Sequence, residues 1–226
     1  MKNNLILLYF SLTSLTLIAQ IDLDNCGNYL DPVEIGEQTW MATNLNTDKF
    51  ANGDLIPEAK SEKAWIEACT KKQAAWCHFE NKSKNGKIYG KLYNWYAVND
   101  PRGLAPKGWR IPTAEDVEKL NKKMWKTVSE EEMKIIKYAF KSDFSGSRHI
   151  LFQDEVFVYF AAVDSSITGC CQWWTSYEIS ETNSCAFISC YTTSNIINGI
   201  SDCNLEEYDG KNKGMGFPVR CILENK

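Results

Sequence analysis

Residues 87–120 read KIYGKLYNWYAVNDPRGLAPKGWRIPTAEDVEKL and carry the strongest structural signals of the chain. Within residues 91–98, apolar side chains recur at i, i+3 and i+4 and also fill the flanking positions, which predicts a short helix buried nearly all round. Asp100 ends this helix, because the residue before a proline is pushed out of the helical region. Residues 109–111 are long enough only for a strand fragment. The stretch predicts a scaffold and says little about chemistry.

A capped helix follows at Thr113. Its hydroxyl can accept the amide of Asp116, which stands where the carboxylate of a capping box belongs, although aspartate reaches back less well than glutamate and predicts a partial box. Val117, Leu120 and Met124 form the apolar stripe of this helix.

Other helices are predicted on both sides of this stretch. Ser129 and Glu132 form a full capping box before a helix. The apolar stripe of that helix is Met133, Ile136 and Phe140. Residues 62–69 predict a short earlier helix. Residues 81–86 are polar and predict a loop.

Strand signals flank these helices. Residues 27–36 predict a hairpin that turns at Asp31–Pro32 and continues into residues 38–45, and Asn52–Gly53 marks a further turn. Beyond Gly146 the apolar period changes to two, which predicts a hairpin turning at residues 153–154. Further strands are predicted at residues 172–176, 185–191, 195–200 and 216–223. Two or three helices in the first half and a mainly antiparallel sheet in the second predict an α+β fold.

The N-terminus predicts export. Residues 1–19 hold one charge, at Lys2, and then an apolar run that ends in a small residue, Ala19, as a signal peptide does. The run is shorter and more polar than a membrane helix requires, and no cysteine follows it closely enough for a lipoprotein cleavage site. We therefore expect a secreted, periplasmic or outer-surface protein with a short segment at residues 20–26, one domain at 27–224 and no membrane span after cleavage.

The net charge bears on the binding partners of the chain, and the cysteine content bears on its disulfides and metal sites. Without the signal peptide, 24 basic residues stand against 29 acidic ones, and a net charge near −5 argues against nucleic acid or an anionic membrane as partner. Nine cysteines in an exported chain predict disulfides, and the odd count leaves at least one thiol unpaired within the chain. With only His78 and His149 to complete a metal site, structural zinc is not expected.

Six sequence blocks occur in an order that resembles a known family, the Fibrobacter succinogenes major paralogous domain. These blocks are residues 38–45 (QTWMATNL), 76–77 (WC), 89–98 (YGKLYNWYAV), 108–113 (GWRIPT), 173–176 (WWTS) and 216–221 (GFPVRC). The family occurs in exported and surface proteins of Bacteroidetes and Fibrobacteres, and the resemblance implies an exported domain without an established activity.

More distantly, the GWRIPT block and the closing strand look like the C-type-lectin-like fold and the formylglycine-generating sulfatase-modifying family. That likeness implies paired N- and C-terminal strands, with Ile35 near Cys221. Because Cys77 and Cys221 both fall in the family blocks, they are the leading candidates for a disulfide. The acidic triplets of calcium-dependent lectins are absent, which puts calcium-dependent sugar binding in doubt.

Two groups of residues are candidate ligand sites. Trp173 and Trp174 could offer a stacking platform for a sugar; as neighbours on a strand they face opposite ways, so one is expected to reach the surface. The tryptophans at 40, 95 and 109 are instead expected in the core. Asp202 and Asn204 open an acidic segment whose oxygens could bind calcium, although it lacks the central glycine of an EF-hand loop and could simply be solvated.

Catalysis has weaker support. Cys77 and His78 could in principle form a thiolate and base, but neighbours in sequence rarely face each other and an exported cysteine is more often in a disulfide. We expect an exported, non-catalytic binding module for a glycan or a cell-surface protein, with its working surface at residues 168–215. The alternatives are an enzyme on a formylglycine-generating scaffold, with a reactive cysteine pair, and a structural component of a surface layer.

Overall fold

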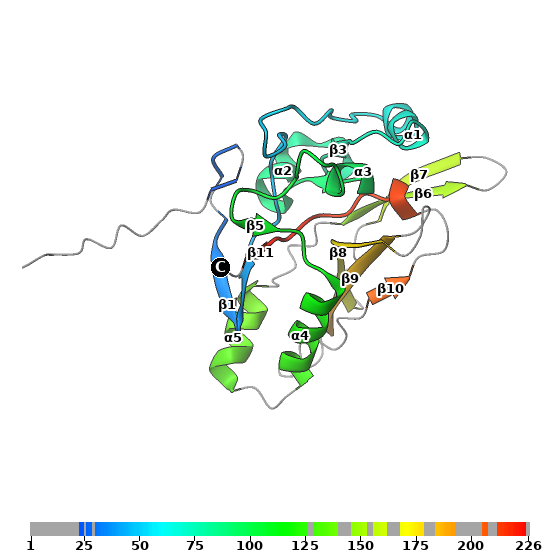
Figure 1. The fold of residues 1–226 in the computed structure, drawn as a ribbon. Coiled ribbons are helices and arrows are strands. Elements are labelled where there is room, and N and C mark those ends of the chain that lie inside the picture. The colour runs from blue at the N-terminus through cyan, green and yellow to red at the C-terminus, as the bar shows by residue number, and fades with distance from the viewer. Residues whose placement is uncertain are drawn as a thin grey trace, which may run out of the picture.

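The computed structural model of the 226-residue chain describes residues 23–24, 26–28, 30–125, 129–139, 146–152, 156–161, 168–178, 184–192, 205–207 and 212–224. Within these residues the protein combines helices with antiparallel sheets, as an α+β fold does. Figure 1 shows the helices α1, α2 and α3 gathered at one end of the molecule and α4 and α5 at the opposite end. No helix in the described ranges is long and apolar enough to cross a membrane.

A four-stranded sheet joins the two ends of the described chain. Its strands are β1 (Pro32–Ile35), β2 (Gln38–Met41), β11 (Ile222–Leu223) and β5 (Trp109–Arg110), in that spatial order. The hairpin of β1 and β2 turns at Gly36, whose φ of +63° suits a residue without a side chain. The predicted turn at Asp31–Pro32 is therefore wrong: Pro32 begins the first strand.

The C-terminal strand inserts beside the second strand of this hairpin. Ile222 faces Trp40 across the β2–β11 pair, and the amide of Met41 donates to the carbonyl of Cys221 at 3.0 Å. Ile35, which was expected near Cys221, lies in β1 on the opposite side of β2 from β11.

The first half of the chain is more helical than the sequence suggested. It contains α1 (Glu62–Thr70), the 3₁₀ turn η1 (Phe79–Asn81), α2 (Ser83–Tyr89) and α3 (Trp95–Val98), with the short pair β3 (Trp76–Cys77) and β4 (Leu92–Tyr93) between them. The helix predicted at residues 62–69 is confirmed. The loop predicted at residues 81–86 is wrong, because most of it belongs to α2.

The aromatic helix predicted at residues 91–98 is shorter than expected. Leu92 and Tyr93 pair with β3, and the helix begins only after Asn94, whose side chain accepts the amide of Ala97 at 3.0 Å. The same Asn94 oxygen also accepts the amide of Ala75 at 3.0 Å, so the capping side chain links α3 to the segment before β3. Burial of this segment is confirmed, since Tyr93 and Trp95 are almost inaccessible to solvent.

Both predicted capping boxes form. In α4 (Ala114–Trp125) the amide of Thr113 donates to Asp116 at 2.7 Å and the amide of Asp116 donates back to the Thr113 hydroxyl at 3.3 Å, so the box is complete and not partial. Ser129 and Glu132 form the equivalent pair before α5 (Glu130–Ala139). Val117 and Leu120 of the predicted stripe are buried. The side chains of Met124 and of the α5 stripe lie outside the described part.

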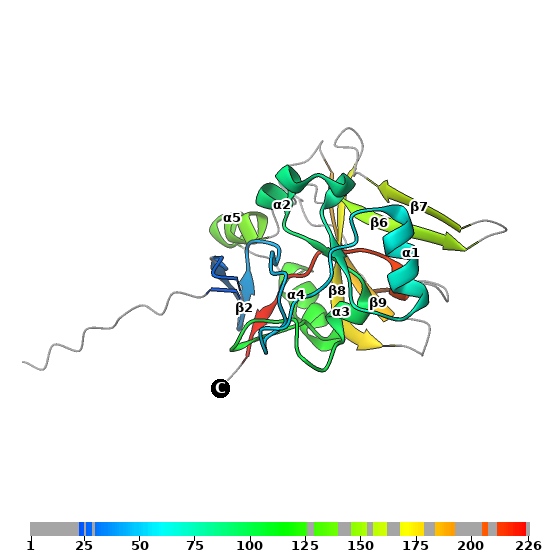
Figure 2. The same cartoon turned by 90° about the horizontal axis from the view of Figure 1, so that it is seen from above.

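The second half forms two further sheets. β6 (Ser147–Phe152) and β7 (Val156–Ala161) pair antiparallel as predicted, and Figure 2 shows them extending away from β2. The turn predicted at residues 153–154 lies outside the described residues. β8 (Thr168–Glu178) pairs with β9 (Ser184–Thr192), which pairs with β10 (Leu205–Glu207). The strand predicted at residues 195–200 lies outside the described residues. Of the strand predicted at 216–223, only β11 is regular, after the 3₁₀ turn η2 (Asn212–Gly214).

Candidate functional site

Trp173 and Trp174 are both fully buried, so the expectation that one would reach the surface is wrong. Trp174 packs against Trp95 and Phe217, with ring centroids 5.6 and 4.7 Å away. On the opposite face of β8 the Arg220 guanidinium lies 4.9 Å from the centre of the Trp173 ring. Covered on both sides, this strand offers no indole face to a sugar.

The predicted calcium ligands, Asp202 and Asn204, lie outside the described residues. Across the described ranges, no group of three or more histidine, cysteine, aspartate or glutamate side chains could hold a metal ion.

The predicted disulfide between Cys77 and Cys221 is wrong, because both residues are free thiols. Cys77 lies in β3 opposite Leu92, whereas Cys221 directly precedes β11 and its carbonyl accepts the amide of Met41. Both side chains are buried in the hydrophobic core as thiols.

Burial also works against thiolate chemistry at these cysteines. It raises the pKa of Cys69 to about 12 and that of Cys77 to about 11, and it raises the pKa of Cys221 as well. Burial lowers the pKa of His78, so this imidazole is neutral at physiological pH. A reactive thiolate needs an electropositive, partly exposed setting, and none of these three thiols has one.

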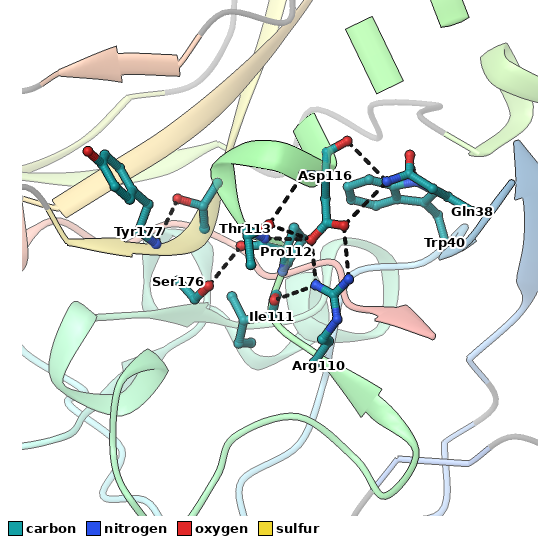
Figure 3. A network of polar contacts seen from close by, with 10 residues as sticks. Gln38, Trp40, Arg110, Ile111, Pro112, Thr113, Asp116, Ser176 and Tyr177 are labelled. Atoms are coloured by element: carbon teal, nitrogen blue, oxygen red, sulfur yellow. Dashed lines mark hydrogen bonds and ion pairs between the residues drawn. The ribbon is translucent and has the colours of Figure 1, made fainter. Parts of the chain in front are cut away.

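The GWRIPT block builds a polar network around Asp116 (Figure 3). The Asp116 carboxylate accepts a hydrogen bond from each terminal nitrogen of Arg110, one at 2.9 Å and the other closer. It also accepts hydrogen bonds from the Thr113 hydroxyl at 2.9 Å and the Thr113 amide at 2.7 Å. Gln38 donates to the same carboxylate at 3.4 Å and to the Asp116 carbonyl at 3.1 Å. The network ties β5, β2 and the first turn of α4 together.

Electrostatics show how firmly this network is held. Burial opposes ionisation of Asp116, but the hydrogen bonds from Arg110 and Thr113 outweigh it and lower the pKa of this carboxyl to about 2. Ser176 of β8 adds two bonds to the Pro112 carbonyl, from its amide at 2.7 Å and its hydroxyl at 3.2 Å. Because every oxygen of Asp116 is already bonded within the protein, we assign the network to structure.

A pocket of about 200 Å³ is the strongest candidate for a binding site. Its walls come from Asp24, Asn28 and Leu30, from the segment after β2, from the C-terminal half of α2 with Gly90, and from Arg220. The polar side chains that line it are Asp24, Asn28, Thr43, Asn44, Asn46, Lys87 and Arg220. Asp24 and Arg220 are only 6 % and 2 % exposed, so the pocket has a buried polar wall and an open rim.

Asn44 is the anchor of the inner wall. Its side-chain oxygen accepts the Trp173 indole at 2.7 Å and the Arg220 Nε at 2.8 Å, and its amide nitrogen donates to the Tyr89 carbonyl at 2.9 Å. Gly90 permits this approach, because a Cβ there would lie 2.9 Å from both the Asn44 Cβ and the Leu45 carbonyl oxygen. Residues from four of the six sequence blocks therefore meet at the Asn44 side chain.

The outer wall is held by Asp24 and Lys91. The Asp24 carboxylate accepts the amides of Cys26 and Asn28 and the Asn28 side chain, each at 2.8 Å. The Lys91 ammonium donates to the Asn46 carbonyl at 2.7 Å and to its side-chain oxygen at 3.0 Å. Burial lowers the pKa of Lys91, and nearby acidic groups, Asp48 most strongly, oppose this shift. These contacts fix the asparagines that face the pocket.

Sequence reasoning missed this pocket because its walls are far apart in the chain. The signal that could have found it lay in the blocks themselves: Asn44, Gly90 and Arg220 are polar or glycine positions inside motifs rich in aromatic and aliphatic residues. Such residues in buried segments need partners, and here the partners are one another.

No curated protein and no solved structure matches the chain. A family model, the Fibrobacter succinogenes major domain, matches residues 33–223. The match includes Asn44, Gly90, Trp173 and Arg220, but not Asp24 and Asn28 of the pocket lining. With most of its length matched, the chain belongs to the Fibrobacter succinogenes major domain family.

Proposed function

We propose that the chain is an exported, non-catalytic binding module that holds a glycan in the pocket beside Asn44. The observation that carries the proposal is the built polar wall, in which amide and charged side chains are fixed by the protein around an open cavity. Small-ligand sites are typically concave and orient their ligand with a few fixed polar groups. The signal-like residues 1–19 support export. An exported module would act in the periplasm, at the outer surface or outside the cell.

A C-type-lectin-like arrangement is part of this proposal. It is supported by the pairing of β11 with the N-terminal hairpin and by the helix, short strand and capped helix of the middle segment. The rival, an enzyme of the formylglycine-generating type, would need a reactive cysteine pair. The raised pKa values of Cys69 and Cys77 weigh against these two thiols in that role.

The test is a binding screen of the mature chain, starting at residue 20, against immobilised polysaccharides and a glycan array. A Thr43→Tyr variant fills the pocket from an exposed wall position, and Lys84→Tyr places the same side chain on α2 outside the pocket. We expect the parent and Lys84→Tyr to bind the same glycans and Thr43→Tyr to lose them. A parent protein that binds no glycan would overturn the proposal.

A further inference from the structure

We propose that the pocket receives one terminal sugar ring and holds two neighbouring hydroxyls between Asn28 and Asn46. This inference rests on the proposed glycan binding and adds the recognition groups and the end-on mode. The two asparagines are adjacent, because the Asn28 side-chain nitrogen lies 3.5 Å from the Asn46 carbonyl oxygen.

The chemistry of their partners fixes how both amides are turned. A lysine ammonium can only donate, so the Asn46 atom 3.0 Å from Lys91 is the oxygen. A carboxylate can only accept, so the Asn28 atom 2.8 Å from Asp24 is the nitrogen. Within the described residues, the Asn28 oxygen and the Asn46 nitrogen make no further hydrogen bond. One acceptor and one donor group therefore remain for a ligand.

This combination suits a sugar better than an ion. A hydroxyl both donates and accepts, so two adjacent hydroxyls can give one hydrogen bond to the Asn28 oxygen and take one from the Asn46 nitrogen. An anion would call for donors alone and a cation for acceptors alone. The pocket also has an apolar side: Ile88 lines it and is 61 % exposed, so its side chain can cover the C–H face of a ring.

The size of the pocket sets the mode of binding. Pockets for drug-sized ligands measure about 300–1,000 Å³, and this one, at about 200 Å³, is below that range. It fits one ring and not several, so the chain end enters while the rest of the glycan stays in solvent. Lys87, exposed on the rim, supplies a further donor at the entrance.

The first experiment changes one recognition group without disturbing the wall. Asn46→Asp keeps an oxygen for Lys91 but replaces the donor nitrogen with an acceptor. Asn52→Asp is the matched control, since Asn52 lies in an exposed turn outside the pocket. By calorimetry with a glycan found in the screen, we expect at least a tenfold loss of affinity for Asn46→Asp and less than a twofold change for the control. Equal affinities for parent and Asn46→Asp would overturn the assignment.

The second experiment separates end-on binding from binding along a chain. Methyl glycosides of the terminal sugar, and oligosaccharides of two to four units, compete for the parent protein. We expect equal potency per mole, within threefold, for all lengths. Potency that rises tenfold or more with each added unit would overturn the one-ring mode. If glycans bind and Thr43→Tyr loses them, but Asn46→Asp or chain length behaves otherwise than expected, only this inference fails; if no glycan binds, or Thr43→Tyr still binds them, the proposed function fails as well.

Discussion

Replacing Asp116 with asparagine tests the polar network of the GWRIPT block most directly. The substitution keeps the size of the side chain but removes the charge that Arg110 and Thr113 stabilise. Asp116 is 4 % exposed, so solvent screens this interaction little. We therefore expect a loss of stability far larger than an exposed ion pair would give.

The size of the loss follows from the pKa. The carboxyl titrates near its ordinary value of 3.8 in the unfolded chain and at about 2 in the folded protein. A difference of that size adds roughly 2.5 kcal/mol to the free energy of unfolding at neutral pH. Because the folded pKa is the lower one, this contribution is complete above about pH 4 and disappears as the pH falls toward 2.

Urea unfolding at several pH values measures this contribution. We expect Asp116→Asn to lose roughly 2–3 kcal/mol at pH 7 and the difference from the parent to shrink steadily below pH 4. Glu118→Gln is the control on the same helix, since its exposed pair with Lys122 at 3.6 Å contributes less than about 0.5 kcal/mol. A loss below about 0.5 kcal/mol, or one that does not change with pH, would refute the reasoning.

Three further predictions concern the core and its thiols. Trp174→Ala should lower the free energy of unfolding by about 3–5 kcal/mol in the same assay, while the exposed Tyr177→Ala should change it by less than about 0.5 kcal/mol. In native protein, iodoacetamide should label Cys26 and leave the three buried thiols unmodified until urea is added, as peptide mapping would show; early labelling of those three contradicts their burial. Gly216→Ala should cost about 1–3 kcal/mol by denaturation, since its Cβ would lie 2.9 Å from that of Arg148; an unchanged midpoint would mean that the neighbouring chain yields freely.

Local signals were the part of the fold that the sequence could predict. The capping boxes at Thr113 and Ser129 depend on residues three positions apart, and both are present. The α2 helix was missed because residues 83–89 have no apolar stripe; its end instead packs against Asn44 through Gly90. Neither the close approach of Gly90 to Asn44 nor the hydrogen bond from Asn44 to the Tyr89 carbonyl can be predicted from the helix sequence alone.

The long-range pairings could not be predicted in the same way. Cys77 and Cys221 stand in recognised blocks, yet that says nothing about which sheet each strand joins. Trp173 and Trp174 alternate on a strand as expected, but alternation does not reveal that both faces of that strand are covered. The pocket shares this difficulty, because its walls come from residues near 24, 44, 88 and 220.

The position of β11 has a consequence for the order of events during biosynthesis. β2 and β5 lie on either side of it, so the four-stranded sheet cannot close until residues 222 and 223 have left the ribosome. Its pairing of Trp40 with Ile222 spans most of the chain, and contacts so distant in sequence slow folding. In a nascent chain this sheet would thus stay open until β11 arrives. If the protein is exported as proposed, this delay leaves the four-stranded sheet to close only after translocation.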